Sequence, residues 1–172
     1  ANGILNGILL INQGNNSNYS GSLSGSGSLS ISSGSQTLSG VNTNAGNTSV
    51  SSNGQLILTG SLSGALSNSS RAANATTIAS GAKVSGNVLN TGPLVVKGTV
   101  GGLTGHISSA TIQSSTNATF DLSIINSGTV NMSETSVIKQ NVTNTSRSIF
   151  NLTDSSQILR DVNNAGTFTI NT

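Results

Sequence analysis

The stretch Leu56-Ile57-Leu58-Thr59-Gly60-Ser61-Leu62 decides the fold, because it recurs as Leu94-Val95-Val96-Lys97-Gly98-Thr99-Val100. A looser copy follows as Val130-Asn131-Met132-Ser133-Glu134. Short segments in which apolar and polar residues alternate also occur at residues 28–31 and 167–170. Alternation with a period of two is typical of a β-strand that buries one face. The chain is therefore predicted to consist of short strands separated by turns.

Glycines that precede these strands in the sequence recur at a longer interval than the strands themselves. The Asn-x-Gly motif and its variants occur as Asn12-Gln13-Gly14, Ser52-Asn53-Gly54, Asn90-Thr91-Gly92, Asn126-Ser127-Gly128 and Asn164-Ala165-Gly166. Successive glycines of this series follow one another at nearly equal intervals of about 38 residues, the kind of fixed period that marks a repeat fold. A second apolar cluster lies midway in each of the last three periods: Ile78 with Val84, Ile112 with Phe120, and Ile149 with Leu152. Half the period, about 19 residues, is the length of one coil of a stacked repeat fold.

A coil of this length cannot bury its own apolar side chains, but coils stacked about 4.8 Å apart pair every strand with its neighbours. We expect the corner glycines to adopt positive φ and the corner asparagines to stack amide on amide. The residues predicted to form these structural turns and ladders are Asn90, Gly92, Asn126, Gly128, Asn164 and Gly166.

The predicted fold is all-β: a right-handed parallel β-helix, or β-solenoid, with about nine coils of roughly 19 residues. Residues 1–172 are expected to form a single β-solenoid segment, in which residues 1–22 form a coil, a lead-in strand or a cap.

Composition leaves few alternatives to this fold. Charged residues make up 6% of the chain and aromatic residues 2%, with one proline. Abundant Gly, Ser and Asn with few Glu, Lys, Arg and Met disfavours helices. Disorder remains an alternative chiefly for residues 17–40, because elsewhere the apolar residues, 33% of the chain, recur at regular intervals. Hairpins built on Asn-Gly turns explain any single motif but not a period that is held over four successive intervals.

The same composition excludes several classes of site and partner. The chain has no Cys, so it has neither disulfides nor thiolate metal ligands. Its six bases are scattered and lack accompanying aromatic residues, so no nucleic-acid partner is expected. The most apolar stretch, residues 4–11, is too short to cross a bilayer, and no transmembrane segment is expected. No cofactor and no metal site are predicted.

Catalysis is not expected either. Parallel β-helices include enzymes that cleave polysaccharides, and these need two or three acids gathered on one face. The four acids of this chain are Asp121, Glu134, Asp154 and Asp161. Only Glu134 and Asp154 are about one coil apart, which chance suffices to explain. The single histidine, His106, is interpreted as a solvated turn residue, and Gly101-Gly102-Leu103-Thr104-Gly105 as a tight bend. A polysaccharide-processing enzyme remains the disfavoured alternative.

One longer run combines the strand and glycine signals: Gly25-Ser-Gly-Ser-Leu29-Ser-Ile31, Leu38-Ser-Gly40-Val-Asn42, Gly46-Asn-Thr48-Ser-Val50 and Gly54-Gln-Leu56-Ile-Leu58. This run resembles the passenger-associated repeat of autotransporters. Residues 81–92 are similar to β-helix rungs of the same passengers and of haemagglutinin-like adhesins. The resemblance covers residues 20–172 and rests on degenerate motifs of common residues. Bactofilin-like cytoskeletal solenoids share the rung pattern but are usually far more charged.

The resemblance implies a non-catalytic module that is secreted or displayed on the bacterial cell surface. Such passengers normally end in an outer-membrane barrel, which this sequence lacks, so the chain is expected to be either a segment of a longer passenger or a member of a different β-solenoid family. The expected role is adhesion or self-association, as in cell aggregation and biofilm formation. The expected partners are a second copy of the chain, or a host or matrix glycan or protein. A structural stalk and a self-polymerising filament subunit are the alternatives.

Overall fold

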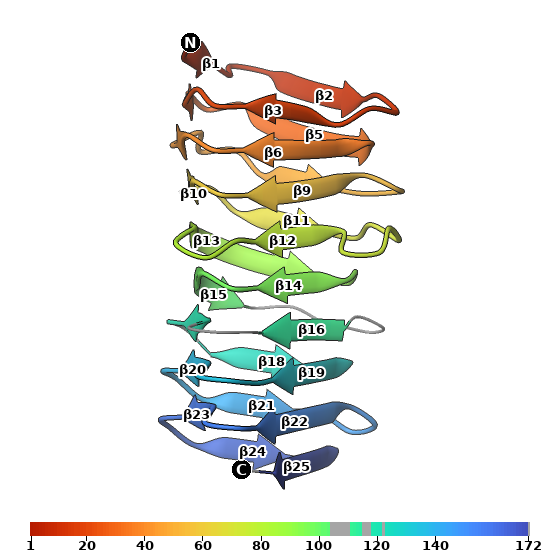
Figure 1. Ribbon diagram of the computed structural model, residues 1–172, viewed down its shortest axis with the longest axis vertical. Helices are drawn as coiled ribbons and strands as arrows, with labels where there is room; N and C mark the ends of the chain where they lie inside the picture. Colours follow the sequence, from red (N-terminus) through yellow and green to blue (C-terminus); the bar gives the residue numbers. More distant parts are fainter. Residues whose placement is uncertain (104–110, 115–117, 122, 172) are drawn as a thin grey trace.

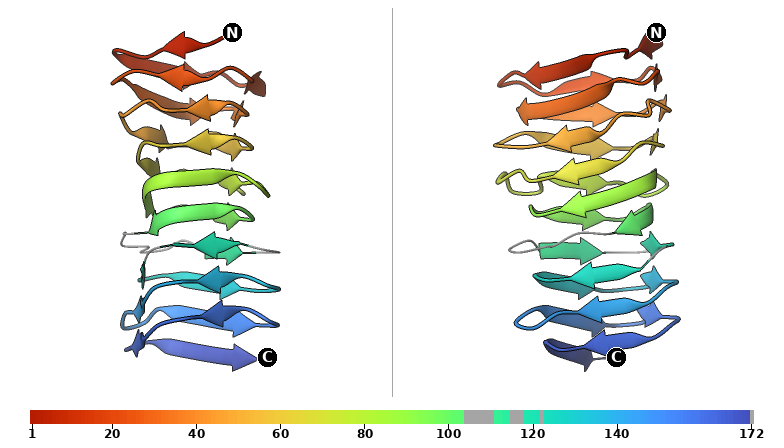
Figure 2. Two further views of the ribbon diagram at one scale, coloured as in Figure 1. Left: turned by 90° about the vertical axis from the view of Figure 1, so that its left-hand side faces the viewer. Right: turned by 180° about the vertical axis from the view of Figure 1, so that it is seen from behind.

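The protein is a stack of short parallel strands with no helix among the residues that the structure describes (Figures 1 and 2). The computed structural model describes residues 1–103, 111–114, 118–121 and 123–171. The strands fall into nine levels that make about eight turns, each level contributing to three faces. In Figure 1 the chain descends as a right-handed coil, since the near strands run to the left and the far ones to the right. This confirms the predicted β-solenoid and its approximate number of coils.

The first two faces share one sheet of 14 strands, except that β1 (Gly3–Ile4) and β4 (Leu23–Ser24) at the start of the first face form a two-stranded sheet of their own. The first face contains β1, β4, β7 (Val41–Asn42), β10 (Ser61–Leu62), β17 (Thr119–Phe120), β20 (Val137–Ile138) and β23 (Gln157–Ile158). The second contains β2 (Ile8–Asn12), β5 (Ser28–Ser33), β8 (Thr48–Val50), β11 (Leu66–Asn68), β18 (Ile124–Asn126), β21 (Val142–Asn144) and β24 (Val162–Asn164). Two longer strands, β13 (Lys83–Asn90) and β15 (Thr99–Leu103), run through both faces and join them.

The third face is a separate sheet of nine strands. It contains β3 (Ser17–Tyr19), β6 (Ser35–Leu38), β9 (Gln55–Leu58), β12 (Thr76–Ile78), β14 (Leu94–Val96), β16 (Thr111–Ser114), β19 (Thr129–Met132), β22 (Ile149–Thr153) and β25 (Thr167–Asn171). Leu56 pairs with Thr76 and Thr76 with Leu94, so one level takes about 19 residues, a length typical of a solenoid coil. The longer repeat that the glycines set in the sequence therefore spans two levels, as predicted.

Every strand predicted from the alternation of apolar and polar residues is present, but one of them lies on a different face from the others. The segments at residues 55–58, 94–96, 129–132 and 167–170 fall in β9, β14, β19 and β25, which occupy alternate levels of the third face. The segment at residues 28–31 belongs to β5 on the second face. Residues 1–22 supply β1, β2 and β3, and each of these strands pairs with a strand of the next level. They form the first level of the stack.

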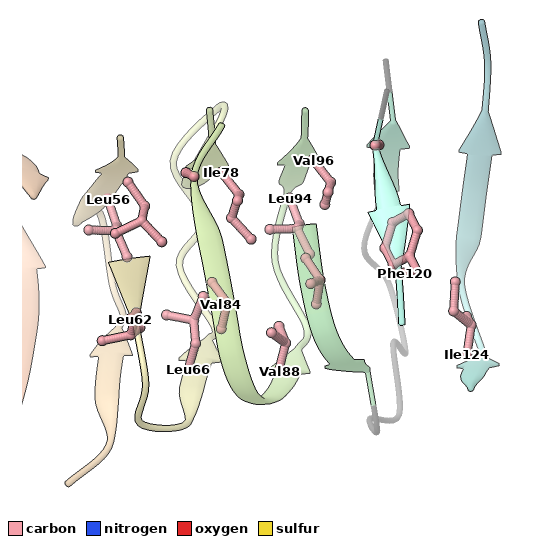
Figure 3. Close-up of a cluster of buried hydrophobic side chains, with 14 of the residues drawn as sticks. Leu56, Leu62, Leu66, Ile78, Val84, Val88, Leu94, Val96, Phe120 and Ile124 are labelled. Carbon is pink, nitrogen blue, oxygen red and sulfur yellow. The ribbon is translucent and has the colours of Figure 1, made fainter. Parts of the chain in front are cut away.

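The core is a column of aliphatic side chains from all three faces (Figure 3). On the third face Leu56, Leu94 and Val130 are buried in register, with one level between each. The first and second faces add residues such as Val84 and Val88, which are fully buried. Because side chains alternate along a strand, the residues between these point to solvent. Inward positions are thus filled mainly by Leu, Ile, Val and Phe stacked one over another.

Close approach between levels, not left-handed backbone, explains two of the predicted corner glycines. A Cβ at Gly92 would clash with the carbonyl oxygen of Ser70, and one at Gly166 with that of Ser148, in the level before. Neither glycine has positive φ, so the expected conformation was wrong for both. The described glycines with positive φ are Gly25, Gly34 and Gly81. The other residues with positive φ are Ser52, Asn74, Glu134, Arg147 and Asp154.

The predicted bend at residues 101–105 is wrong over its first part. Gly101 and the two residues after it continue strand β15 (Thr99–Leu103), and β15 pairs with β13 along both faces. A Cβ at Gly101 would lie 2.7 Å from the carbonyl oxygen of Ser85, so glycine here permits close pairing of two strands. Gly105 lies outside the described residues.

We expect Val96→Asp to unfold the middle of the stack. Val96 is fully buried on the inner side of β14, and an unpaired charge there costs at least about 3 kcal/mol of the free energy of unfolding. The control is Val95→Asp, which places the same charge on the outward side of the same strand. Chemical denaturation followed by circular dichroism measures both variants. Equal stability of the two would contradict the assignment of the inner face.

Thr76→Val should stabilise the protein. The Thr76 side chain is fully buried between Leu56 and Leu94, and its hydroxyl has no hydrogen-bond partner. Valine has nearly the same shape without the desolvated hydroxyl, so the free energy of unfolding should rise by about 1 kcal/mol. Thr77→Val, on the outward side of the same strand, should change it by less than about 0.5 kcal/mol. A denaturation midpoint that falls for Thr76→Val would show that this hydroxyl does have a partner in solution.

Candidate functional site

The predicted asparagines lie on the inner side of the second face, at the corner where it meets the third. Asn126 donates a hydrogen bond from Nδ2 to Oδ1 of Asn144 at 2.8 Å, and Asn144 does the same to Asn164 at 2.8 Å. Nearer the N-terminus, Asn68 donates to Oδ1 of Asn90 at 2.7 Å. At this corner the structure thus stacks Asn126 and Asn164 through Asn144, and Asn90 on Asn68. We call these two stacks of amides together the asparagine ladder.

The asparagine ladder also ties the second face to the third. Nδ2 of Asn68 donates to the carbonyl oxygen of Pro93 at 2.8 Å, and Nδ2 of Asn144 to that of Thr167 at 2.9 Å. Each carbonyl belongs to the level after that of its asparagine, since Pro93 immediately precedes β14 and Thr167 is the first residue of β25. Glycine backbones complete the corner, since Asn90 donates to the carbonyl of Gly92 at 2.7 Å. The same contact joins Asn126 to Gly128 and Asn164 to Gly166.

Sequence reasoning missed two members of the ladder, Asn68 and Asn144. Neither is followed by glycine at the second position, because Ser70 and Ser146 stand there. The available signal was the spacing, since Asn68, Asn90, Asn126, Asn144 and Asn164 all end strands of the second face. Those asparagines that lie inside the stack are nearly inaccessible to solvent, so the ladder stabilises the fold and presents no group to a ligand.

The acidic residues do not assemble a catalytic group among the described residues. Glu134 and Asp154 occupy the same turn in adjacent levels, and a carboxylate oxygen of Asp154 accepts the backbone N–H of Glu134 at 3.0 Å. Both side chains are exposed. Asp121 instead forms an ion pair with Lys139 at 2.8 Å. The described part of the chain holds no group of three His, Asp or Glu residues able to bind a metal ion. His106 lies outside the described residues.

A loop at residues 69–75 interrupts the regular surface and carries the most distinctive site of the molecule. It connects β11 to β12 at the corner of the asparagine ladder and bulges outward (right side of Figure 1). Eight positions separate Asn68 from Thr76, whereas four separate the equivalent pair Asn90 and Leu94. The extra residues create a hollow on each side of the loop.

The first hollow, of about 370 Å³, opens on the third face and is lined by Gln55, Ile57, Asn74, Thr77, Val95 and Lys97. Ile57, Thr77 and Val95 are neighbours in register on three successive strands. They form a flat, partly apolar floor, and the polar groups of Gln55, Asn74 and Lys97 stand around it. We call this hollow the sheet hollow.

The second hollow, of about 440 Å³, lies at the corner itself and is lined by Ser51, Ser52, Asn53, Ser69 and Arg71. Its lining consists of hydroxyl groups, an amide and a guanidinium, and it contains no acid. We call it the corner hollow. Sequence reasoning did not find either hollow, because the loop that creates them has no motif of its own. The one available signal was charge, since no Asp or Glu precedes Asp121.

Comparisons with known proteins found no relative. No family model, no curated protein and no solved structure matches the chain. Within the part of the chain that the structure describes, no helix is long and apolar enough to span a membrane.

Asn144→Ala should destabilise the stack, because it removes four contacts of the asparagine ladder. Asn144 donates to Asn164 and to the Thr167 carbonyl, and it accepts from Asn126 and from the hydroxyl of Ser148. Leaving such buried groups without partners should lower the free energy of unfolding by about 3 kcal/mol. The control is Asn163→Ala at the exposed neighbouring position. Thermal and chemical denaturation test this, and equal loss in both variants would show that the ladder contributes nothing specific.

Proposed function

We propose that this chain is a non-catalytic β-helical segment of a secreted or surface-displayed bacterial protein and that it acts in adhesion. The observation that carries the proposal is the pair of hollows around residues 69–75, set on a scaffold whose outer surface is otherwise built mainly of uncharged polar side chains. The resemblance to autotransporter passengers supports the location. A rigid stack with one elaborated loop is suited to holding a recognition surface in a fixed orientation.

The chemistry of the sheet hollow favours a carbohydrate. Its floor combines the aliphatic side chains of Ile57 and Val95 with the hydroxyl of Thr77, and amide groups stand at its edge. The C–H groups of a sugar ring pack on aliphatic surface, while its hydroxyls need donors and acceptors in fixed positions. Gln55 is held in place because its Nε2 donates to the carbonyl of Ala73 at 2.6 Å. A glycan is therefore the ligand class that this surface fits best.

Self-association is the second candidate. Within this chain β3 and β25, the outermost strands of the third face, each pair on one side only. The outer levels also expose large apolar side chains: Ile4, Ile8, Leu10, Leu159 and Ile170. Unpaired parallel edges with exposed aliphatic side chains are templates for another strand. A second copy stacked end to end would pair these edge strands and cover Ile170, which lies in register with the inward residue Leu152.

The proposed function predicts saturable binding of the purified chain to immobilised glycans of bacterial or host surfaces. Thr77→Tyr fills the sheet hollow and should weaken that binding at least tenfold. The control is Thr143→Tyr, at an equally half-buried outward position on β21 of the second face, which should bind as the parent does. Biolayer interferometry measures both variants.

Three outcomes decide against parts of this proposal. Absence of binding to every glycan and matrix protein tested would overturn the adhesive role. A molecular mass that rises with protein concentration in sedimentation velocity experiments without ligand would favour self-association instead. Release of reducing sugars from any polysaccharide would overturn the non-catalytic assignment.

A further inference from the structure

The loop at residues 69–75 is held in a defined conformation by hydrogen bonds to the preceding level. The hydroxyl of Ser70 donates to the carbonyl oxygen of Gly54 at 2.6 Å, and the backbone N–H of Arg71 donates to that of Ser52 at 2.8 Å. The Ser70 hydroxyl also accepts the backbone N–H of Ala72 at 3.2 Å. These contacts fix the backbone on both sides of Arg71 while its side chain stays exposed. The guanidinium is thus presented from an ordered loop.

Each hollow beside this loop contains a cation and no acid. Arg71 borders the corner hollow together with hydroxyl and amide groups, and Lys97 borders the sheet hollow. An ion pair joins Asp121 to Lys139, elsewhere in the chain. A guanidinium presents planar paired donors that match a carboxylate or sulfate, and serine hydroxyls add further donors. The corner hollow therefore has the donor set of an anion site.

The distribution of charge along the chain strengthens this conclusion. Residues 1–120 contain three bases, Arg71, Lys83 and Lys97, and no acid. Residues 121–172 contain three bases and four acids. Because position along the chain is position along the stack, the levels around the loop are purely cationic. At physiological ionic strength charges are screened beyond about 8 Å, so the acids of the distant levels do not neutralise them.

We propose that the two hollows together bind an acidic polysaccharide, with Arg71 and Lys97 contacting its carboxylate or sulfate groups. A sugar ring lies on the floor formed by Ile57, Thr77 and Val95, and the chain continues past the loop to the corner hollow. This inference rests on the proposed adhesive function and names the class of its ligand. It goes beyond that function in predicting that affinity depends on charge at two named residues.

The test uses the intact chain and four polymers: polygalacturonate as the carboxylated glycan, dextran sulfate as the sulfated one, dextran as the neutral one, and poly-L-glutamate as an anion without sugar. We expect one or both acidic glycans to bind at least tenfold more tightly than dextran and poly-L-glutamate. The double variant Arg71→Gln with Lys97→Gln should lose at least tenfold in affinity and show a weaker dependence on salt. The matched control, Arg147→Gln with Arg160→Gln, removes two exposed bases from the distant levels and should bind as the parent does.

The outcomes separate this inference from the proposed function. Glycan binding that is equal for dextran and the acidic glycans, and unchanged in the Arg71 and Lys97 variant, would overturn the inference and leave the adhesive role standing. Equal binding of poly-L-glutamate would overturn the assignment to a sugar chain. Equal losses in the two double variants would show that net charge acts without a site. Failure of all polymers and all other glycans to bind would overturn both proposals. Circular dichroism of each variant establishes that it is folded.

Discussion

Hydrogen bonding between successive levels is the interaction on which the rest of this structure depends. At the corner between the second and third faces the backbone N–H of Ser69 donates to the carbonyl of Val50, and that of Thr91 to the carbonyl of Asn68, both at 2.8 Å. Such bonds hold neighbouring strands about 4.8 Å apart. No single level stands alone, since the strands of each level pair with strands of its neighbours. Cohesion is thus a property of the stack, and each coil depends on its neighbours.

The same spacing explains the choice of corner residues. Where the chain turns sharply, levels this close leave no room for a side chain, and Gly92 and Gly166 meet that requirement. At the corner the asparagine amides add donors to backbone carbonyls. The carbonyl of Pro93 accepts the backbone N–H of Thr76 at 3.3 Å and the amide of Asn68 at 2.8 Å. A buried amide that recurs at each level can hydrogen-bond both to the next amide and to the backbone of the turn, so the asparagines of the ladder stabilise the core.

The sequence predicted the position of a strand wherever a structural requirement recurs at every second level and only one residue type can meet it. The Asn-x-Gly motifs and the strands after them located alternate levels of the third face, including β14 and β19, because close approach and amide stacking both restrict the residue choice. The short strands of the first face carried no comparable signal, since two residues such as those of β10 show no periodicity. The ladder members Asn68 and Asn144 escaped because serine replaced glycine in their longer corners. The hollows escaped because they arise from the number of residues in one loop, while their lining consists of residues common throughout the chain.

The position of that loop follows from the physics of the stack. Pairing between levels must resume in register after each corner, but the path between the second and third faces can lengthen without disturbing either. The corner takes four positions from Asn90 to Leu94, six from Asn144 to Phe150 and eight from Asn68 to Thr76. The corner between the third and first faces also varies, from four positions between Leu58 and Leu62 to six between Ile78 and Val84. At the corner between the second and third faces, Asn68 and Thr76 at the ends of the loop remain buried in the core. A surface feature placed there can change its shape and charge at little cost to the scaffold. This explains why the cationic hollows lie beside the longest of these corners.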